Sequence, residues 1–127
     1  MKGNDLAGRF AVVTGCAPGI GLAMARKLGA SAGRGACTEV AANCAAVDVT
    51  CPDAVVAAAR SPADDFGRID ALVTSAGIAG PNAPVVDCPA ADRRRSIEVK
   101  LQEVFRCCRA LVPSMMAQGY GYTVNIT

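Results

Sequence analysis

The residues with the clearest chemical role form a glycine-rich segment near the start of the chain. This segment reads Thr14-Gly15-Cys16-Ala17-Pro18-Gly19-Ile20-Gly21 and follows an apolar, β-branched run. A strand, a glycine turn and a helix in direct succession place backbone N–H groups and the positive end of a helix dipole at one spot, which suits a pyrophosphate. The pattern therefore predicts that residues 15–21 contact a dinucleotide.

The three glycines of this segment have different expected roles. Gly15 permits a tight turn, Gly19 removes a Cβ where a phosphate must approach, and Gly21 lets the following helix lie close to the sheet. A glycine turn with a purely structural role is the alternative interpretation. A phosphate loop of the nucleoside triphosphatase type is excluded, because no Gly-Lys-Ser/Thr sequence follows.

An acidic residue after a second strand would bind the ribose hydroxyls of the dinucleotide and repel a 2′-phosphate. Glu39 lies 18 positions after Gly21, close to the interval of about 20 residues that this role requires. A surface glutamate explains Glu39 equally well, because residues 35–40 form only a weak strand pattern. The expected cofactor is NAD or NADP, with a weak preference for NAD.

The remaining reactive residues do not form a recognisable catalytic centre. The chain has no histidine, which excludes a Ser-His or Cys-His nucleophile, and its seven cysteines lack the paired spacing of a zinc site. Neither Tyr120 nor Tyr122 has a lysine four residues later, so a phenol of pKa near 10 would be a poor acid or base at neutral pH. We assign no catalytic residue and no metal ligand.

The elements that position the glycine segment alternate between strands and helices. Short, strand-like runs occur at residues 10–14, 45–49, 71–74 and 122–127. Helical patterns occur at 22–28, from 52 onward, and at 93–116. This alternation predicts an α/β sheet.

Two expectations concern the helices. Pro62 should break or kink the helix that begins near residue 52, because proline lacks an N–H and clashes with the preceding turn. The helix at 93–116 has apolar residues at three- and four-residue steps, which should face the sheet or a partner. These residues are Ile97, Leu101, Val104, Phe105, Cys108, Leu111 and Val112.

Composition restricts the partners and the location. The 127 residues suit one domain, and no apolar run approaches the ~20 residues of a membrane-spanning helix. The net charge of +2 is too balanced to direct the chain to nucleic acid or to a membrane surface. The first residues lack the pattern of a secretory signal, so we expect a cytoplasmic location.

With these motifs in view, the chain resembles the short-chain dehydrogenases/reductases, which are NAD(P)-dependent oxidoreductases. Residues 14–21 match the family pattern T-G-x-x-x-G-x-G, and residues 66–70 resemble the run before the fourth strand of the family. Asp48 and Val49 match a pair that holds the adenine. Thr74, Ser75, Ala76 and Gly77 resemble an altered N-N-A-G motif. The stretch from 99 to 126 is similar to the fifth helix and strand of the family.

The resemblance implies a Rossmann-like, doubly wound parallel sheet within one partial NAD(P)-binding domain, residues 1–127. It also implies cofactor contacts from six further residues, Asp48, Val49, Thr74, Ser75, Ala76 and Gly77. The substrate of the family is a small molecule with a carbonyl or a secondary alcohol, and the reaction is hydride transfer to or from the nicotinamide.

The chain departs from the family at its catalytic residues. Lys100, which we interpret as a charge on the helix surface, holds the place of the family's asparagine in Val99-Lys100-Leu101. The catalytic serine would follow Thr127, and the Y-x-x-x-K motif would lie further on. We therefore expect a fold truncated after strand five and no turnover by this chain alone.

A second departure lies between strands two and three. Only about residues 40–45 separate the two expected strands, whereas a parallel crossover needs a dozen residues or more. The family has a helix there, and its loss would remove one side of the adenine pocket. The sheet is therefore expected to be shortened at this point.

Three functions are consistent with these patterns. The first is the NAD(P)-binding portion of a short-chain dehydrogenase. The second is a non-catalytic nucleotide-binding or oligomerisation module that forms a homo-oligomer through the 93–116 helix. The third, a methyltransferase-like nucleotide domain, agrees less well with the full T-G-x-x-x-G-x-G match.

Overall fold

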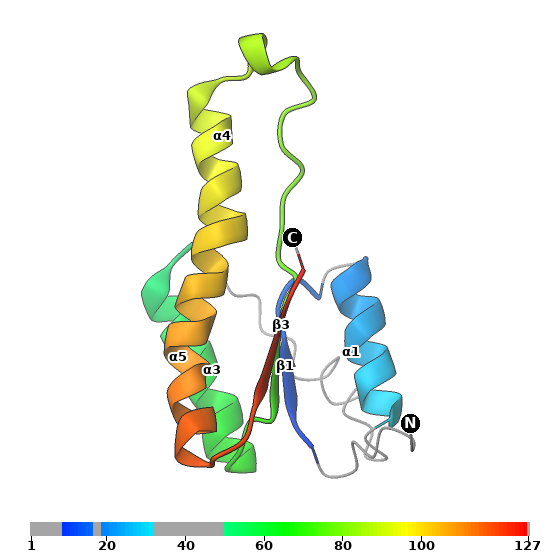
Figure 1. Ribbon diagram of the computed structural model, residues 1–127, viewed down its shortest axis with the longest axis vertical. Coiled ribbons are helices and arrows are strands. Elements are labelled where there is room, and N and C mark those ends of the chain that lie inside the picture. Colours follow the sequence, from blue (N-terminus) through cyan, green and yellow to red (C-terminus); the bar gives the residue numbers. More distant parts are fainter. Residues whose placement is uncertain (1–8, 17–18, 32–49, 127) are drawn as a thin grey trace.

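A computed structural model describes residues 9–16, 19–31 and 50–126 of the protein. In this part of the chain a parallel sheet is flanked by helices (Figure 1). Its strands are β1 (Ala11–Val13), β2 (Ala71–Thr74) and β3 (Tyr122–Asn125), in the order β1-β2-β3. Both pairings are parallel. The expected α/β architecture is therefore confirmed.

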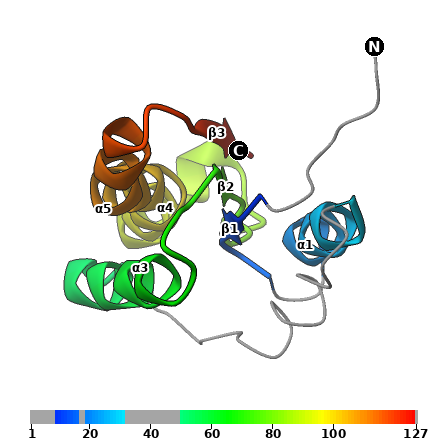
Figure 2. The same ribbon diagram turned by 90° about the horizontal axis from the view of Figure 1, so that it is seen from below.

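The helices form one layer on each face of the sheet (Figure 2). Helix α1 (Ile20–Ser31) covers one face, and α3 (Pro52–Phe66) and α5 (Glu103–Ala117) cover the other. A short 3-10 helix, η1 (Val85–Asp87), precedes α4 (Ala90–Ile97). The π-helical turn η2 (Glu98–Gln102) joins α4 to α5. The resulting long helix extends beyond the end of the sheet (Figure 1).

The core lies between the sheet and the layer of α3 and α5. Six buried residues form it: Val55, Ile69, Leu72, Cys107, Leu111 and Met115. Burial of each large apolar side chain contributes about 1.5–3 kcal/mol. The position of this core explains why β2, the central strand, contributes the fully buried Leu72.

Of the two expected effects of Pro62, a break in the helix is wrong, and a kink stays a prediction. Helix α3 runs through Pro62 to Phe66, and α5 likewise contains Pro113. Proline removes one helical hydrogen bond, but most helix stability in proteins comes from tertiary packing. Packing of α3 against α5, with Val55 buried in the shared core, offsets the local cost.

The apolar stripe expected on the 93–116 helix is only partly buried. Its buried face instead consists of Val99, Glu103, Cys107, Leu111 and Met115, at steps of four residues. Ile97, Leu101 and Phe105 remain 37%, 64% and 58% exposed. Periodicity alone does not tell which side of a helix faces the sheet: within the regular turns of α5, Phe105 lies two residues from both Glu103 and Cys107, on the side opposite the face that contacts α3 and β2.

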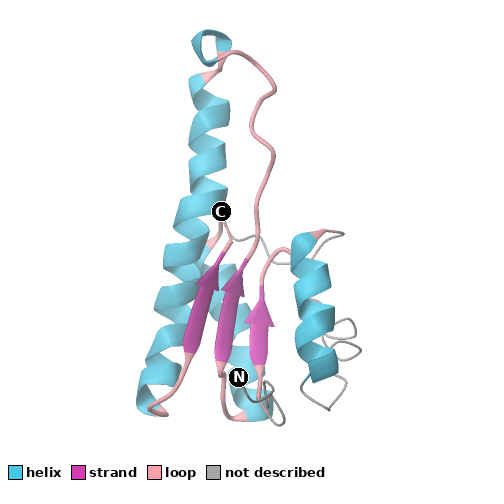
Figure 3. Ribbon diagram, turned by 45° about the vertical axis from the view of Figure 1, so that its right-hand side comes forward, coloured by secondary structure: helices cyan, strands magenta, loops and turns pink. Residues whose placement is uncertain are grey.

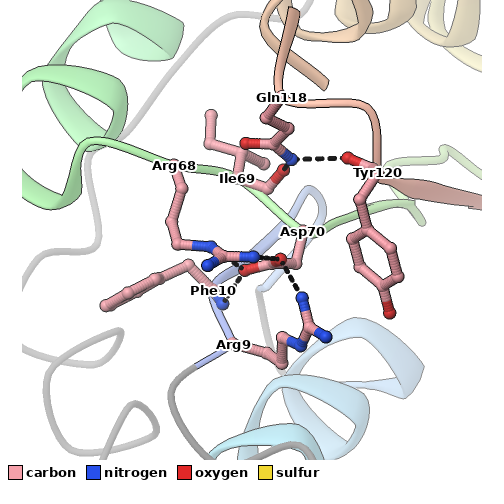
Figure 4. Close-up of polar contacts among 7 residues, drawn as sticks. All are labelled: Arg9, Phe10, Arg68, Ile69, Asp70, Gln118 and Tyr120. Carbon is pink, nitrogen blue, oxygen red and sulfur yellow. Dashed lines mark hydrogen bonds and ion pairs between the residues drawn. The ribbon is translucent and has the colours of Figure 1, made fainter. Parts of the chain in front are cut away.

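A buried carboxylate joins several segments at the amino ends of the strands. Asp70 is 3% exposed and accepts hydrogen bonds from the Arg9 guanidinium at 2.9 Å and from the Phe10 backbone N–H at 2.9 Å. Arg68 forms a third, two-pronged contact with the same carboxylate. Asp70 therefore connects the start of β1 with the start of β2 (Figure 4).

The turn between α5 and β3 joins the same cluster. The Arg9 guanidinium lies over the Tyr120 ring, 4.2 Å from its centroid. The Gln118 amide donates hydrogen bonds to the carbonyl oxygens of Ile69 and Tyr120 (Figure 4). These contacts fix the register in which β3 enters the sheet beside β2.

Two opposing effects act on the pKa of Asp70. Burial alone raises it, but hydrogen bonds from Arg68, from the Phe10 N–H and from Arg9 outweigh burial and lower the pKa below its usual value. The carboxylate therefore stabilises the fold above the pKa of the unfolded chain, about 3.9. This contribution is lost as the pH falls through the lower pKa of the folded state.

We predict that Asp70→Asn lowers the free energy of unfolding by about 2–3 kcal/mol at pH 7, because it leaves two guanidinium groups without their carboxylate. Urea denaturation followed by circular dichroism measures this change. The difference from the wild type should begin to shrink below about pH 4, where the carboxylate of the unfolded wild type becomes protonated, and should disappear only below the lower pKa of the folded state. Asp92→Asn, on the exposed surface of α4, is the matched control. Equal stability of Asp70→Asn and the wild type at pH 7 would contradict the role of this cluster.

Candidate functional site

The carboxyl ends of the three strands lie together at one edge of the sheet (Figure 3). The glycine segment follows β1 at this edge, and α1 begins within its last two residues, at Ile20. The first turn of α1 is formed by a hydrogen bond from the Ala23 N–H to the Gly19 carbonyl oxygen, 3.1 Å long. The positive end of the α1 dipole is therefore located where a ligand of a doubly wound sheet binds.

Gly15 is required by its backbone angle and by its neighbours. Its φ is +68°, and an added Cβ would lie 2.6 Å from backbone atoms of Ser75 and Ala76. No side chain fits at this distance. The glycine segment therefore packs directly against the segment that follows β2.

Gly21 closes the other side of the same turn. A Cβ at this position would lie 2.3 Å from the carbonyl oxygen of Gly15. The start of α1 therefore packs on the turn itself, and not only on the sheet as the sequence suggested. Gly19, with a φ of 151°, is exposed between these two contacts.

The hydroxyl of Thr14 connects three segments at this edge. It accepts hydrogen bonds from the backbone N–H groups of Ser75 at 3.0 Å and Ala76 at 3.2 Å. It donates its own proton to the carboxylate of Glu103, the first residue of α5. The end of β1, the segment after β2 and α5 therefore depend on one side chain.

Sequence reasoning missed both the Thr14 hydroxyl and Glu103. Glu103 is 1% exposed and lies on the buried face of the helix, four residues from Val99 and four from Cys107. This spacing was the available signal, because a charged residue in register with buried apolar residues needs a partner. The partner, Thr14, is distant in sequence and could not be identified from the pattern.

Burial raises the pKa of the Glu103 carboxyl, and the hydrogen bond from Thr14 acts in the opposite direction. Burial and the nearby charge of Glu103 raise the pKa of the Cys107 thiol to about 12. Cys107 is therefore a neutral thiol at pH 7 and not a nucleophile. The Thr14–Glu103 hydrogen bond holds the end of β1 against α5.

The four residues of the Thr74–Gly77 segment differ in their access to solvent. Thr74 is fully buried, and its hydroxyl donates a 2.9 Å hydrogen bond to the Asn125 side chain on β3. Ser75 and Ala76 are half-buried, and Gly77 is exposed. Residues 75–77 therefore form the accessible surface beside the glycine segment, whereas Thr74 ties β2 to β3.

The structure brings together only part of the predicted site. Gly15, Cys16, Gly19, Ile20 and Gly21 lie at the same edge of the sheet as residues 74–77. The Cys16 thiol contacts the Val13 carbonyl oxygen at 3.1 Å. The other five predicted contacts lie outside the described residues: Ala17, Pro18, Glu39, Asp48 and Val49. The connection between strands two and three, which the sequence predicts to be shortened, also lies outside the described residues.

Comparison with known proteins identifies the family of this chain. Residues 9–127 match the short chain dehydrogenase family. The chain belongs to this family. This membership explains why the glycine segment, the strand order and the segment after β2 occur together.

Several relatives match almost the whole chain. The 2-dehydro-3-deoxy-L-rhamnonate dehydrogenase (NAD(+)) of Sphingomonas sp. (strain SKA58) is 37% identical, with 94% of this chain and 53% of the relative covered. A metagenomic short-chain oxidoreductase in complex with NADP is 34% identical with a TM-score of 0.81, covering 97% of this chain and 63% of that one. An NAD+-bound xylitol dehydrogenase is 30% identical with a TM-score of 0.79, covering 94% and 53%. The chain spans about half the length of the curated relatives it matches.

Among the described residues, none of the helices is both long and apolar enough to span a membrane.

We predict that Glu103→Gln raises stability at pH 7.5 by about 1 kcal/mol, because it keeps an acceptor for Thr14 and removes a buried charge. The folded carboxyl has the higher pKa, so the folded state binds more protons than the unfolded state above about pH 4.3. The wild type therefore loses stability as the pH rises through this range, and the variant does not.

Thermal denaturation of both proteins between pH 4.5 and pH 7.5 tests this prediction. Asp87→Asn, an exposed acid on η1, serves as the control. The prediction would be contradicted if the difference in stability between the wild type and Glu103→Gln were the same at all pH values, or if the variant were less stable at pH 7.5. Either result would show that the buried charge of Glu103 does not destabilise the fold.

Proposed function

We propose that this chain is the NAD(P)-binding portion of a short-chain dehydrogenase/reductase, forming one partial domain over residues 1–127. The main support is the close packing of Gly15 on Ser75 and Ala76 at the carboxyl edge of a parallel sheet. That contact places the glycine segment and the start of α1 where a dinucleotide binds in doubly wound folds. The partner is a dinucleotide and not a nucleic acid or a membrane.

The residues present fit a dinucleotide. The absence of Cβ atoms at Gly15 and Gly21 keeps the turn tight, so that its backbone N–H groups can face a pyrophosphate. Residues 75–77 supply an accessible surface beside that turn. The proposed cofactor contacts are Gly15, Cys16, Ala17, Pro18, Gly19, Ile20, Gly21, Glu39, Asp48, Val49, Thr74, Ser75, Ala76 and Gly77.

The choice between the two nicotinamide cofactors depends on Glu39. One structural relative holds NADP and another holds NAD+, so the fold accepts either. A carboxylate after the second strand would bind ribose hydroxyls and repel a 2′-phosphate. We propose NAD as the preferred cofactor on this basis.

The proposed reaction of the whole protein is hydride transfer between the nicotinamide and a small molecule with a carbonyl or secondary alcohol. The bound cofactor supplies the hydride chemistry, and the protein supplies binding and orientation. Within these 127 residues, neither tyrosine has a lysine four residues later to lower its pKa. We propose that this polypeptide, in the cytoplasm, binds the dinucleotide without turning over an alcohol.

We predict that the chain binds NADH and that Gly19→Asp weakens this binding by about tenfold or more, because a carboxylate would face the pyrophosphate. Fluorescence titration with NADH measures the affinity, and a parallel titration with NADPH tests the preference. Gly67→Asp is a matched control, since Gly67 also has a positive φ, at 68°, and lies before β2 at the opposite edge.

Circular dichroism should show that both glycine variants remain folded. No NADH or NADPH binding by the folded wild type would overturn the proposed function. Production of NADH from NAD and any of a panel of secondary alcohols would contradict the proposal that this polypeptide does not turn over an alcohol.

Oligomerisation through the 93–116 helix is a second proposal. Ile97, Leu101 and Phe105 follow one another at four-residue steps and all remain exposed. An apolar row of this kind on a helix is typical of a surface that packs against another helix. We propose that a second copy of the chain packs on this row.

We predict that the wild type elutes as a dimer in size-exclusion chromatography with light scattering, and that Leu101→Glu shifts it to monomer. The reason is that a glutamate would be forced into an apolar interface. Val85→Glu changes an even more exposed apolar residue, on η1, and should leave the dimer intact. If the wild type is still a monomer at about 100 μM, its affinity for a second copy is too weak for the proposed dimer.

A further inference from the structure

Lys100 brings a positive charge to the carboxyl edge of the sheet. It lies in the π-turn η2 between α4 and α5. Its Cε atom is 3.8 Å from the position that a Cβ on Gly77 would occupy. The ammonium group, one bond beyond Cε, therefore lies beside the segment that follows β2.

This location is close to the glycine segment. Gly15 packs against Ser75 and Ala76, and Gly77 is the next residue along the chain. Two residues of extended backbone span about 7 Å. A ligand resting on the glycine segment and extending over β2 would therefore pass within reach of the Lys100 ammonium.

The described residues give Lys100 no ion-pair partner of its own. The neighbouring carboxylates are engaged elsewhere: Glu98 pairs with Arg106, and Glu103 is buried against Thr14. Lys100 is itself exposed, as expected from the sequence. The π-turn that presents it is a rare local geometry, frequent at functional sites.

The strand order indicates which half of a dinucleotide would reach Lys100. In a doubly wound sheet, strands two and three lie beyond β1, on the side away from β2. The adenine contacts that the sequence predicts, Glu39, Asp48 and Val49, lie at the ends of the expected strands two and three in the sequence. The nicotinamide half would therefore extend from the glycine segment over β2, toward Gly77 and Lys100.

We propose that the Lys100 ammonium binds the nicotinamide nucleotide half of the dinucleotide through charge-assisted hydrogen bonds to its phosphate or ribose oxygens. This inference rests on the proposed function, since it requires a dinucleotide on the glycine segment. It assigns a binding role to a residue that the family pattern would fill with asparagine. Lysine adds a full positive charge with three N–H donors, which suits phosphate and ribose oxygens.

The test compares Lys100→Gln with the wild type, using NADH and AMP as probes in isothermal titration calorimetry. AMP carries the adenosine half without the nicotinamide nucleotide. We expect Lys100→Gln to weaken NADH binding about 5- to 20-fold, because a partly exposed charge-assisted contact is lost. AMP binding should change by less than about twofold. Arg109→Gln, which removes the same charge from an exposed position on α5, should leave both affinities unchanged.

The outcomes separate this inference from the function on which it rests. Failure of the wild type to bind NADH would overturn the proposed function itself. Wild-type NADH binding with no change in Lys100→Gln would overturn the role of Lys100 alone. An equal loss for NADH and AMP, or an equal loss in Arg109→Gln, would show a general effect of net charge and would also overturn it.

Discussion

The edge of the sheet at the carboxyl ends of the strands depends on the hydrogen bonds of the Thr14 hydroxyl. This hydroxyl accepts hydrogen bonds from the backbone N–H groups of Ser75 and Ala76, and it donates a hydrogen bond to the buried carboxylate of Glu103. Gly15 packs closely on the same two half-buried residues, and their backbone N–H groups have the Thr14 hydroxyl as their acceptor. One side chain thus sets the position of the glycine segment, the segment after β2 and α5.

The amino edge is held by a different kind of contact. There the Asp70 carboxylate accepts hydrogen bonds from Arg9, Arg68 and the Phe10 N–H, and the Arg9 guanidinium also lies over the Tyr120 ring. Between these two polar junctions, apolar packing of β2 against α3 and α5 supplies most of the stability. The two edges of the sheet have different roles. The ion pairs of Asp70 fix the register of the strands, whereas the hydrogen bonds of Thr14 leave the adjacent backbone accessible to a ligand.

The glycine segment and the alternation of strands and helices could be predicted because they depend on local residue preferences. A short apolar run predicts the strand at 71–74, and apolar residues at three- and four-residue steps predict the helix before 122–127. Two predictions about the helices were wrong in detail. Pro62 did not end α3, and of the apolar stripe predicted on the 93–116 helix Leu111 is buried whereas Ile97, Leu101 and Phe105 are exposed. Local patterns do not contain the packing energy that tolerates a proline, nor do they tell which side of a helix faces the sheet.

The sequence by itself determined the family, the parallel α/β architecture and the need for glycine after β1, because each follows from short motifs and residue periodicity. Only the tertiary structure decided which distant residues meet: Thr14 with Glu103, Asp70 with Arg9, and Lys100 with Gly77. These pairs are 23 to 89 positions apart in the sequence. No local pattern encodes such contacts, because they arise when strands and helices pack on one another around a shared core.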